Sequence, residues 1–73
     1  MKELIDRLYN HCIQKRRLEL TEGQADLFRY ACEKSIKENP SLDFDNLSIA
    51  ANIYLNLILD NPTIDLGPIQ EPG

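Results

Sequence analysis

The sequence predicts a small all-α protein: a three-helix bundle with an extended, proline-rich C-terminal tail. Two observations predict the helices. Apolar residues recur at helical spacing in the first half of the chain, and residues 47–59 form a run without any charge. A third observation predicts the tail, because three of the four prolines fall in residues 62–73. We therefore expect a three-helix domain over residues 1–61 and an extended or flexible tail over residues 62–73.

Residues 2–17 have the spacing of an amphipathic helix. Acidic side chains come early in this segment, at Glu3 and Asp6, and basic ones come late, at residues 15–17, as the helix dipole favours. The connection through residues 18–20 is short, so the next helix should return antiparallel and form a hairpin with this one. The apolar stripe consists of Leu4, Ile5, Leu8, Cys12 and Ile13.

The second predicted helix begins after Thr21 and ends near Glu38. Thr21 followed three residues later by Gln24 is a capping-box pattern, in which each side chain bonds the backbone of the other residue. Pro40 pushes the residue before it out of helical geometry and so ends the helix.

Asp43 is predicted to cap the third helix, which is packed across the hairpin and ends at Asp60 and Asn61. This helix is apolar on every side except for one narrow row of polar residues spaced four apart. The row has two interpretations: it faces solvent, which we favour slightly, or it forms a hydrogen-bonding ridge inside a helix pair. It consists of Ser48, Asn52 and Asn56.

A helix that is apolar nearly all round must be covered nearly all round, and two amphipathic helices can cover only part of it. We therefore predict that the remaining face is a homodimer contact or a groove for a partner. The candidate interface residues are Ile49, Ile53, Tyr54, Leu57 and Ile58.

The tail is expected to be a frayed end, since proline at this density prevents regular structure. In the alternative interpretation, the alternation of Ile64 and Leu66 lets its first half lie along the bundle.

Charge is unevenly placed. The formal net charge is −4, and every lysine and arginine lies in residues 1–37. This asymmetry arises by chance in a short chain, or it marks a molecule with two charged faces that docks a charged partner. The basic cluster at residues 15–17 is interpreted as compensation of the helix dipole. Nucleic-acid binding is not expected, because the third helix holds no Lys, Arg or Gln to contact a base edge.

No catalytic, cofactor or metal site is predicted. Cys12 and Cys32 are expected to be reduced, buried side chains, and His11 is expected to be a surface residue in cationic surroundings. Asp43 and Asp45 lack the further ligands of a calcium loop. We expect neither enzymatic activity nor a small-molecule substrate.

The predicted function is that of a small regulatory or inhibitory accessory protein, which binds another protein or itself, as a homodimer, through the third helix. An immunity-like or antitoxin-like bundle that neutralises a toxin is one alternative, and a small nucleic-acid-binding regulator is a second. We expect a cytoplasmic protein, because charged residues interrupt any early signal sequence and the 13-residue uncharged run is shorter than the roughly 20 residues of a membrane span.

Overall fold

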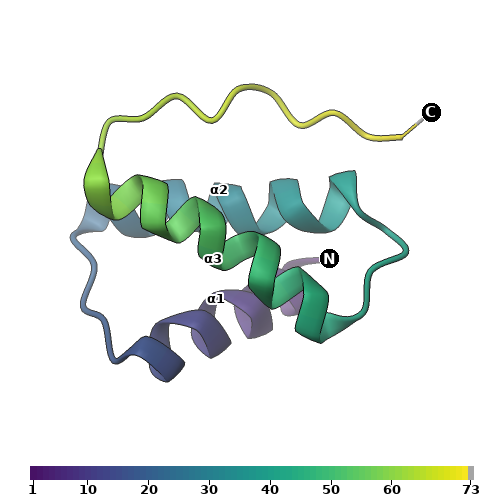
Figure 1. Ribbon diagram of the computed structural model, residues 1–73, viewed down its shortest axis with the longest axis horizontal. Coiled ribbons are helices and arrows are strands. Elements are labelled where there is room, and N and C mark those ends of the chain that lie inside the picture. Colours follow the sequence, from purple (N-terminus) through teal and green to yellow (C-terminus); the bar gives the residue numbers. More distant parts are fainter. Residues whose placement is uncertain (73) are drawn as a thin grey trace.

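Three helices pack together, and each contacts the other two (Figure 1). The structure, a computed structural model, describes residues 1–72. Its helices are α1 (Lys2–Arg16), α2 (Glu22–Glu38) and α3 (Phe44–Asp60), and the described residues contain no strand. The predicted all-α, three-helix architecture is thus confirmed. No helix within residues 1–72 has the length and apolar character needed to cross a membrane.

The starts of α2 and α3 are fixed by the side chains that the sequence predicts. The Thr21 hydroxyl accepts a hydrogen bond from the Gln24 backbone N–H at 3.2 Å, and the Gln24 side chain accepts one from the Thr21 N–H at 3.0 Å. The Asp43 carboxylate accepts from the Asn46 N–H at 2.9 Å. Each cap satisfies backbone donors that the first helical turn leaves free, so each helix has a defined first residue.

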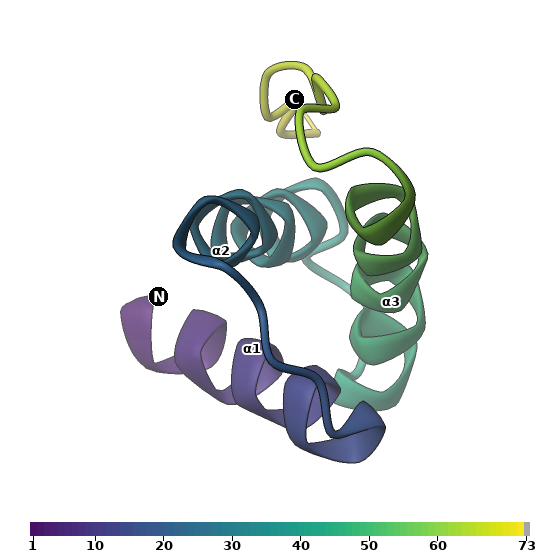
Figure 2. The same cartoon turned by 90° about the vertical axis from the view of Figure 1, so that its left-hand side faces the viewer.

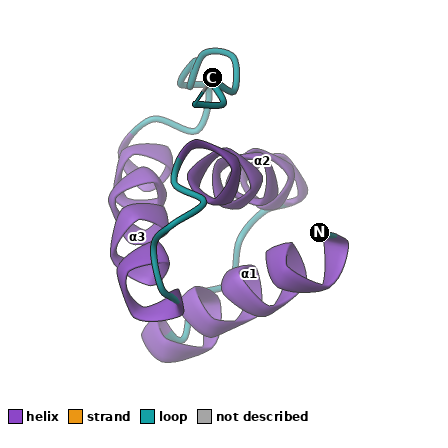
Figure 3. Ribbon diagram, turned by 90° about the vertical axis from the view of Figure 1, so that its right-hand side faces the viewer, coloured by secondary structure: helices purple, strands orange, loops and turns teal. Residues whose placement is uncertain are grey.

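The core lies where the three helices meet. Figures 2 and 3 show α2 nearly end-on, with α1 beneath it and α3 along one side. Ala31 of α2 and Ala51 of α3 are fully buried, so the core contains small side chains as well as large ones. The largest completely buried apolar side chains are Leu8, Cys32, Phe28, Leu55 and Ile58.

Residues 62–72 of the tail do not form a frayed end. The tail runs along α2 in the same direction as that helix (Figure 1), with Ile64 and Leu66 packed against the core. The Tyr30 hydroxyl donates to the Gly67 carbonyl at 2.5 Å, and Lys34 Nζ donates to the Pro68 carbonyl at 2.7 Å. The expectation of fraying was therefore wrong and the alternative holds, because α2 supplies donors to an extended chain that cannot pair with itself.

Candidate functional site

The solvent-facing side of α3 carries three large aliphatic side chains in line. Ile49 is 62% exposed, Ile53 is 58% exposed and Leu57 is 41% exposed. They are spaced four residues apart, so they are neighbours on one side of the helix. We call these three residues the outer stripe. None of the three belongs to the buried core or packs against it, and together they form a row of apolar surface beside polar side chains.

The other two candidate interface residues lie elsewhere. Tyr54 is half-buried and packs against the core. Ile58 is completely buried, so it is a core residue and does not belong to a surface in the folded chain. The physical reason is the helical angle: Ile58 falls on the side of α3 that α1 and α2 cover, whereas Leu57 falls outside it.

The polar row of α3 faces α1 as well as solvent. Arg16 Nη1 donates to Asn52 Oδ1 at 2.9 Å and to Asn56 Oδ1 at 2.7 Å. Ser48 and Asn52 are half-buried. The Ser48 hydroxyl donates to the Phe44 carbonyl of its own helix, and Asn56 is exposed. The row therefore still borders solvent, as the favoured interpretation has it, while Asn52 and Asn56 also bind Arg16 of α1 and form a hydrogen-bonding ridge within one chain.

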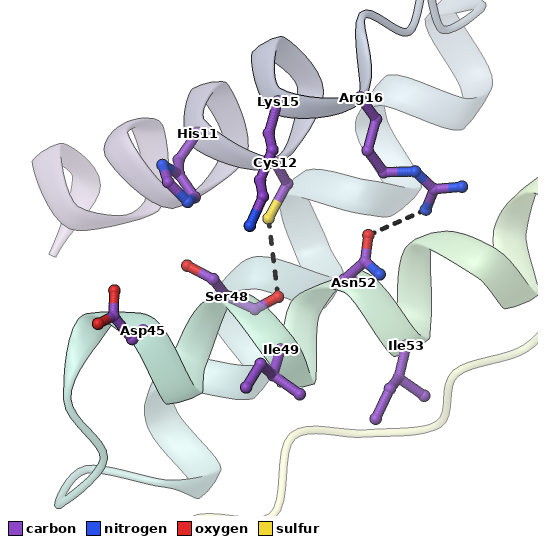
Figure 4. Close-up of a pocket in the computed structure, with 9 residues that line it drawn as sticks. All are labelled: His11, Cys12, Lys15, Arg16, Asp45, Ser48, Ile49, Asn52 and Ile53. Atoms are coloured by element: carbon purple, nitrogen blue, oxygen red, sulfur yellow. Dashed lines mark hydrogen bonds between the residues drawn. The ribbon is translucent and has the colours of Figure 1, made fainter.

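An open groove of about 690 Å³ runs between α1 and α3 beside this ridge. Figure 4 shows its residues: basic side chains extend from α1, and Ile49 and Ile53 lie parallel to each other along the far side of α3. Asp45 is the one carboxylate among them. The groove is lined by His11, Cys12, Lys15, Arg16, Asp45, Ser48, Ile49, Asn52 and Ile53.

Phe44, the first residue of α3, lies beside His11, one of the residues that line the groove. The Arg7 guanidinium lies over the Phe44 ring at 4.9 Å from its centroid, and the His11 ring meets the same ring edge-on at 5.2 Å between centroids. His11 is exposed, as expected for a surface residue. These contacts fix two nitrogen-bearing side chains at the start of α3, where Asp43 and Asp45 also lie.

The two cysteines are free and buried, as the sequence predicts. Burial raises the pKa of the Cys12 thiol and raises that of Cys32 to about 12. A protonated thiol is neither a good nucleophile nor a metal ligand. Cys12 Sγ instead lies 3.9 Å from the Ser48 carbonyl at the base of the groove. Both cysteines are core side chains, and the Cys12 thiol at the base of the groove is protonated at neutral pH.

Within residues 1–72, three of the eight basic side chains pair with carboxylates. Arg29 bonds Asp6, and the other two pairs are Lys34–Glu38 at 2.7 Å and Lys37–Glu33 at 2.8 Å. All three lie on α2. Within residues 1–72, the basic residues of α1 make no such ion pair, and no group of three histidine, cysteine or acidic side chains is placed to hold a metal ion. The unneutralised positive charge is therefore concentrated along α1.

Sequence analysis missed the role of Arg16, because the basic cluster and the polar row were interpreted separately. The available signal was the pair of asparagines four residues apart in an otherwise apolar helix, whose side-chain oxygens can accept hydrogen bonds from one donor.

Comparison with protein-family models, with curated proteins and with solved structures gives no match to this chain.

Proposed function

We propose that this chain is a small non-enzymatic protein-interaction module, which acts as a regulatory or inhibitory accessory protein by covering a surface of another protein with α3. The outer stripe is the observation that carries this proposal. Three aliphatic side chains are left 41–62% exposed on a helix whose opposite side is already fully packed. Burying the exposed part of each is worth about 1 kcal/mol.

The surroundings of the outer stripe support a contact with protein. Asn46, Asn56 and Asp60 are exposed on the same side of α3, so the apolar row has a polar margin. An apolar centre with a polar rim is the usual composition of a protein interface. An immunity-like or antitoxin-like protein would use this face in the same way, so that alternative differs in the partner and not in the surface.

A homodimer is the second candidate, and the spacing of the outer stripe favours it. Ile49 and Leu57 lie equally far from Ile53, so two copies of α3 can pair antiparallel about a two-fold axis at Ile53. Each Ile49 then meets the Leu57 of the other copy. In that arrangement, however, Asp45 of each copy lies close to Asp60 of the other, which places like charges together at both ends.

Site-specific photo-crosslinking tests the proposal. A benzophenone side chain replaces Ile53 in the full chain, and a control carries it at Asp26, an exposed position of α2. We expect one discrete adduct from position 53 after irradiation of producing cells, and none from position 26. An adduct of twice the chain mass identifies the homodimer. No adduct from position 53, or the same adducts from both positions, contradicts the proposal.

A further inference from the structure

Arg16 is held in place without being neutralised. Both of its hydrogen bonds come from Nη1 and go to neutral amides, those of Asn52 and Asn56. Neither amide cancels the positive charge. The Nη2 and Nε donors have no partner among residues 1–72, and these two N–H groups form one edge of the planar guanidinium. Such an edge accepts a carboxylate through two parallel hydrogen bonds.

The groove beside Arg16 is positive along its α1 edge. Lys15 and Arg16 line it, and neither pairs with a carboxylate within the described residues. The single acidic lining residue, Asp45, lies at the start of α3 and hence at the opposite end from Arg16. The chain as a whole carries −4, so this edge is a local reversal of the overall charge.

The groove is also amphipathic across its width. The basic edge belongs to α1, and Ile49 and Ile53 lie on the side of α3 farther from it (Figure 4). A helix laid along α3 would place its own apolar stripe on the outer stripe and one of its polar flanks beside Arg16. Amphipathic helices bind other proteins in grooves of this kind.

We propose that the occupant of this groove is an acidic amphipathic helix of a partner protein, with a carboxylate bound by the free edge of Arg16. This inference rests on the proposed function of α3 as an interaction surface, and it adds the chemistry of the partner. A second copy of the chain fits less well, because between Asp45 and Asp60 its α3 carries no acidic residue to offer Arg16.

Three designed helical peptides of about four turns provide the test. They share one leucine stripe and differ only on one flank, which carries glutamate, glutamine or lysine. Fluorescence anisotropy measures the binding of each to the full chain. We expect the glutamate peptide to bind about tenfold more tightly than the glutamine peptide, and the lysine peptide to bind most weakly. The net charge of the chain favours the opposite order, so this order can arise only from the local site.

Variants assign the preference to Arg16. Arg16→Gln is expected to remove the tenfold advantage of the glutamate peptide and to leave the binding of the glutamine peptide unchanged. Arg16→Lys keeps the charge but loses the planar edge, and it should retain only part of the advantage. Arg17→Gln is the matched control: it makes the same charge change one residue away, outside the groove lining, and should keep the order of the peptides.

The possible outcomes distinguish a failure of this inference from a failure of the proposed function of α3 as an interaction surface. If all three peptides bind equally and Ile53→Asp abolishes their binding, the inference of an acidic partner is wrong but α3 is still an interaction surface. Tighter binding of a single-stranded DNA oligonucleotide than of the glutamate peptide, with loss in Arg16→Gln, assigns the basic edge to nucleic acid and overturns the inference. Dimers seen by light scattering and abolished by Ile53→Asp make a second copy the occupant, which also overturns it.

Discussion

At the scale of single residues, Arg17 ends α1 in an uncommon backbone conformation. Its φ of 54° and ψ of 44° lie in the left-handed region, where its N–H donates to the Gln14 carbonyl at 3.2 Å and the next N–H, of Leu18, donates to the Ile13 carbonyl at 3.1 Å. A side chain with a Cβ is strained there, and glycine is the residue that helices most often place at this position.

Arg17→Gly is therefore expected to stabilise the chain. Relief of the left-handed strain is worth about 1–2 kcal/mol, and the added freedom of the unfolded chain offsets about 0.5–1 kcal/mol of it. The net gain in the free energy of unfolding should be about 0.5 kcal/mol, measured by urea denaturation. Gln14→Gly, an exposed position inside the same helix, should instead lower it by about 1 kcal/mol. Equal losses in both variants would contradict this account of the helix end.

Cys32 makes the stability of the fold fall at alkaline pH. In the unfolded chain its thiol loses a proton near the ordinary pKa of 9.0, whereas burial keeps it protonated in the folded chain up to about 12. The folded state thus binds more protons in this range, and stability falls as the pH rises through it.

The loss attributable to Cys32 should approach about 1.4 kcal/mol per pH unit above the unfolded pKa. Urea denaturation of the wild type and of Cys32→Ala, from neutral pH upward, measures it as a difference in slope. The variant is expected to be less stable at neutral pH, because it leaves a cavity, but to lose less stability on alkalinisation. Parallel pH profiles would show that the thiol is not desolvated.

At the scale of elements, the tail is attached to α2 through polar contacts around Glu38. Glu38 Oε2 accepts from Lys34 Nζ at 2.7 Å and from the Gln70 backbone N–H at 2.8 Å. Its bond to Lys34 is the main reason that the pKa of Glu38 is lowered, and the Gln70 N–H adds to it. These contacts stabilise the docked tail above the ordinary pKa of 4.5 and are lost as the pH falls through the lowered value.

Glu38→Gln should loosen the tail without unfolding the bundle. The expected result is faster hydrogen exchange of the Gln70 amide relative to its intrinsic rate, with the amides of α3 unchanged. The wild type should show the same relative acceleration when the pH falls through the lowered pKa of Glu38, which lies below 4.5. Glu33→Gln is the control, since it removes an ion pair of the same helix, with Lys37, and Glu33 accepts no hydrogen bond from the described residues of the tail. Faster exchange of the Gln70 amide in both variants would mean that docking of the tail depends on the charges of α2 in general and not on Glu38.

The two sides of α3 should respond differently to the same substitution. Ile53→Asp changes an exposed side chain and should alter the free energy of unfolding by no more than about 0.5 kcal/mol. Ile58→Asp places an unpaired carboxylate in the core and should abolish the cooperative unfolding transition. Circular dichroism during urea denaturation distinguishes them. Unfolding of Ile53→Asp would show that the outer stripe is covered within the chain.

The elements differ in how far the sequence predicts them, for physical reasons. Thr21 and Asp43 cap helices with their own side chains, so the sequence around each cap is enough to predict it. The tail is held through the backbone carbonyls of Gly67 and Pro68. Because every residue has such a carbonyl, the side chains of the tail do not predict these two hydrogen bonds. Likewise, the outer stripe follows from the excess of apolar residues in α3, but the burial of Ile58 depends on how α3 rotates against its neighbours.

At the scale of the whole molecule, free positive charge and exposed apolar surface border the same groove from two edges. The bases of α2 are neutralised within the described residues and those of α1 are not, and the exposed Ile49 and Ile53 form the far edge of the groove, on the side of α3 away from α1 (Figure 4). The opposite side is closed by the tail (Figure 2). The central claim is that the α1–α3 side binds a partner while the side beneath the tail maintains the fold.

A two-dimensional ¹H–¹⁵N spectrum, recorded while the glutamate-flanked peptide is titrated into the labelled chain, tests this claim most directly. The account predicts that the shifted amides cluster at the end of α1, around Lys15 and Arg16, and along α3 around Ile49 and Ile53, with α2 and the tail unchanged. Shifts confined to α2 and the tail, or shifts that persist in Ile53→Asp, would contradict it.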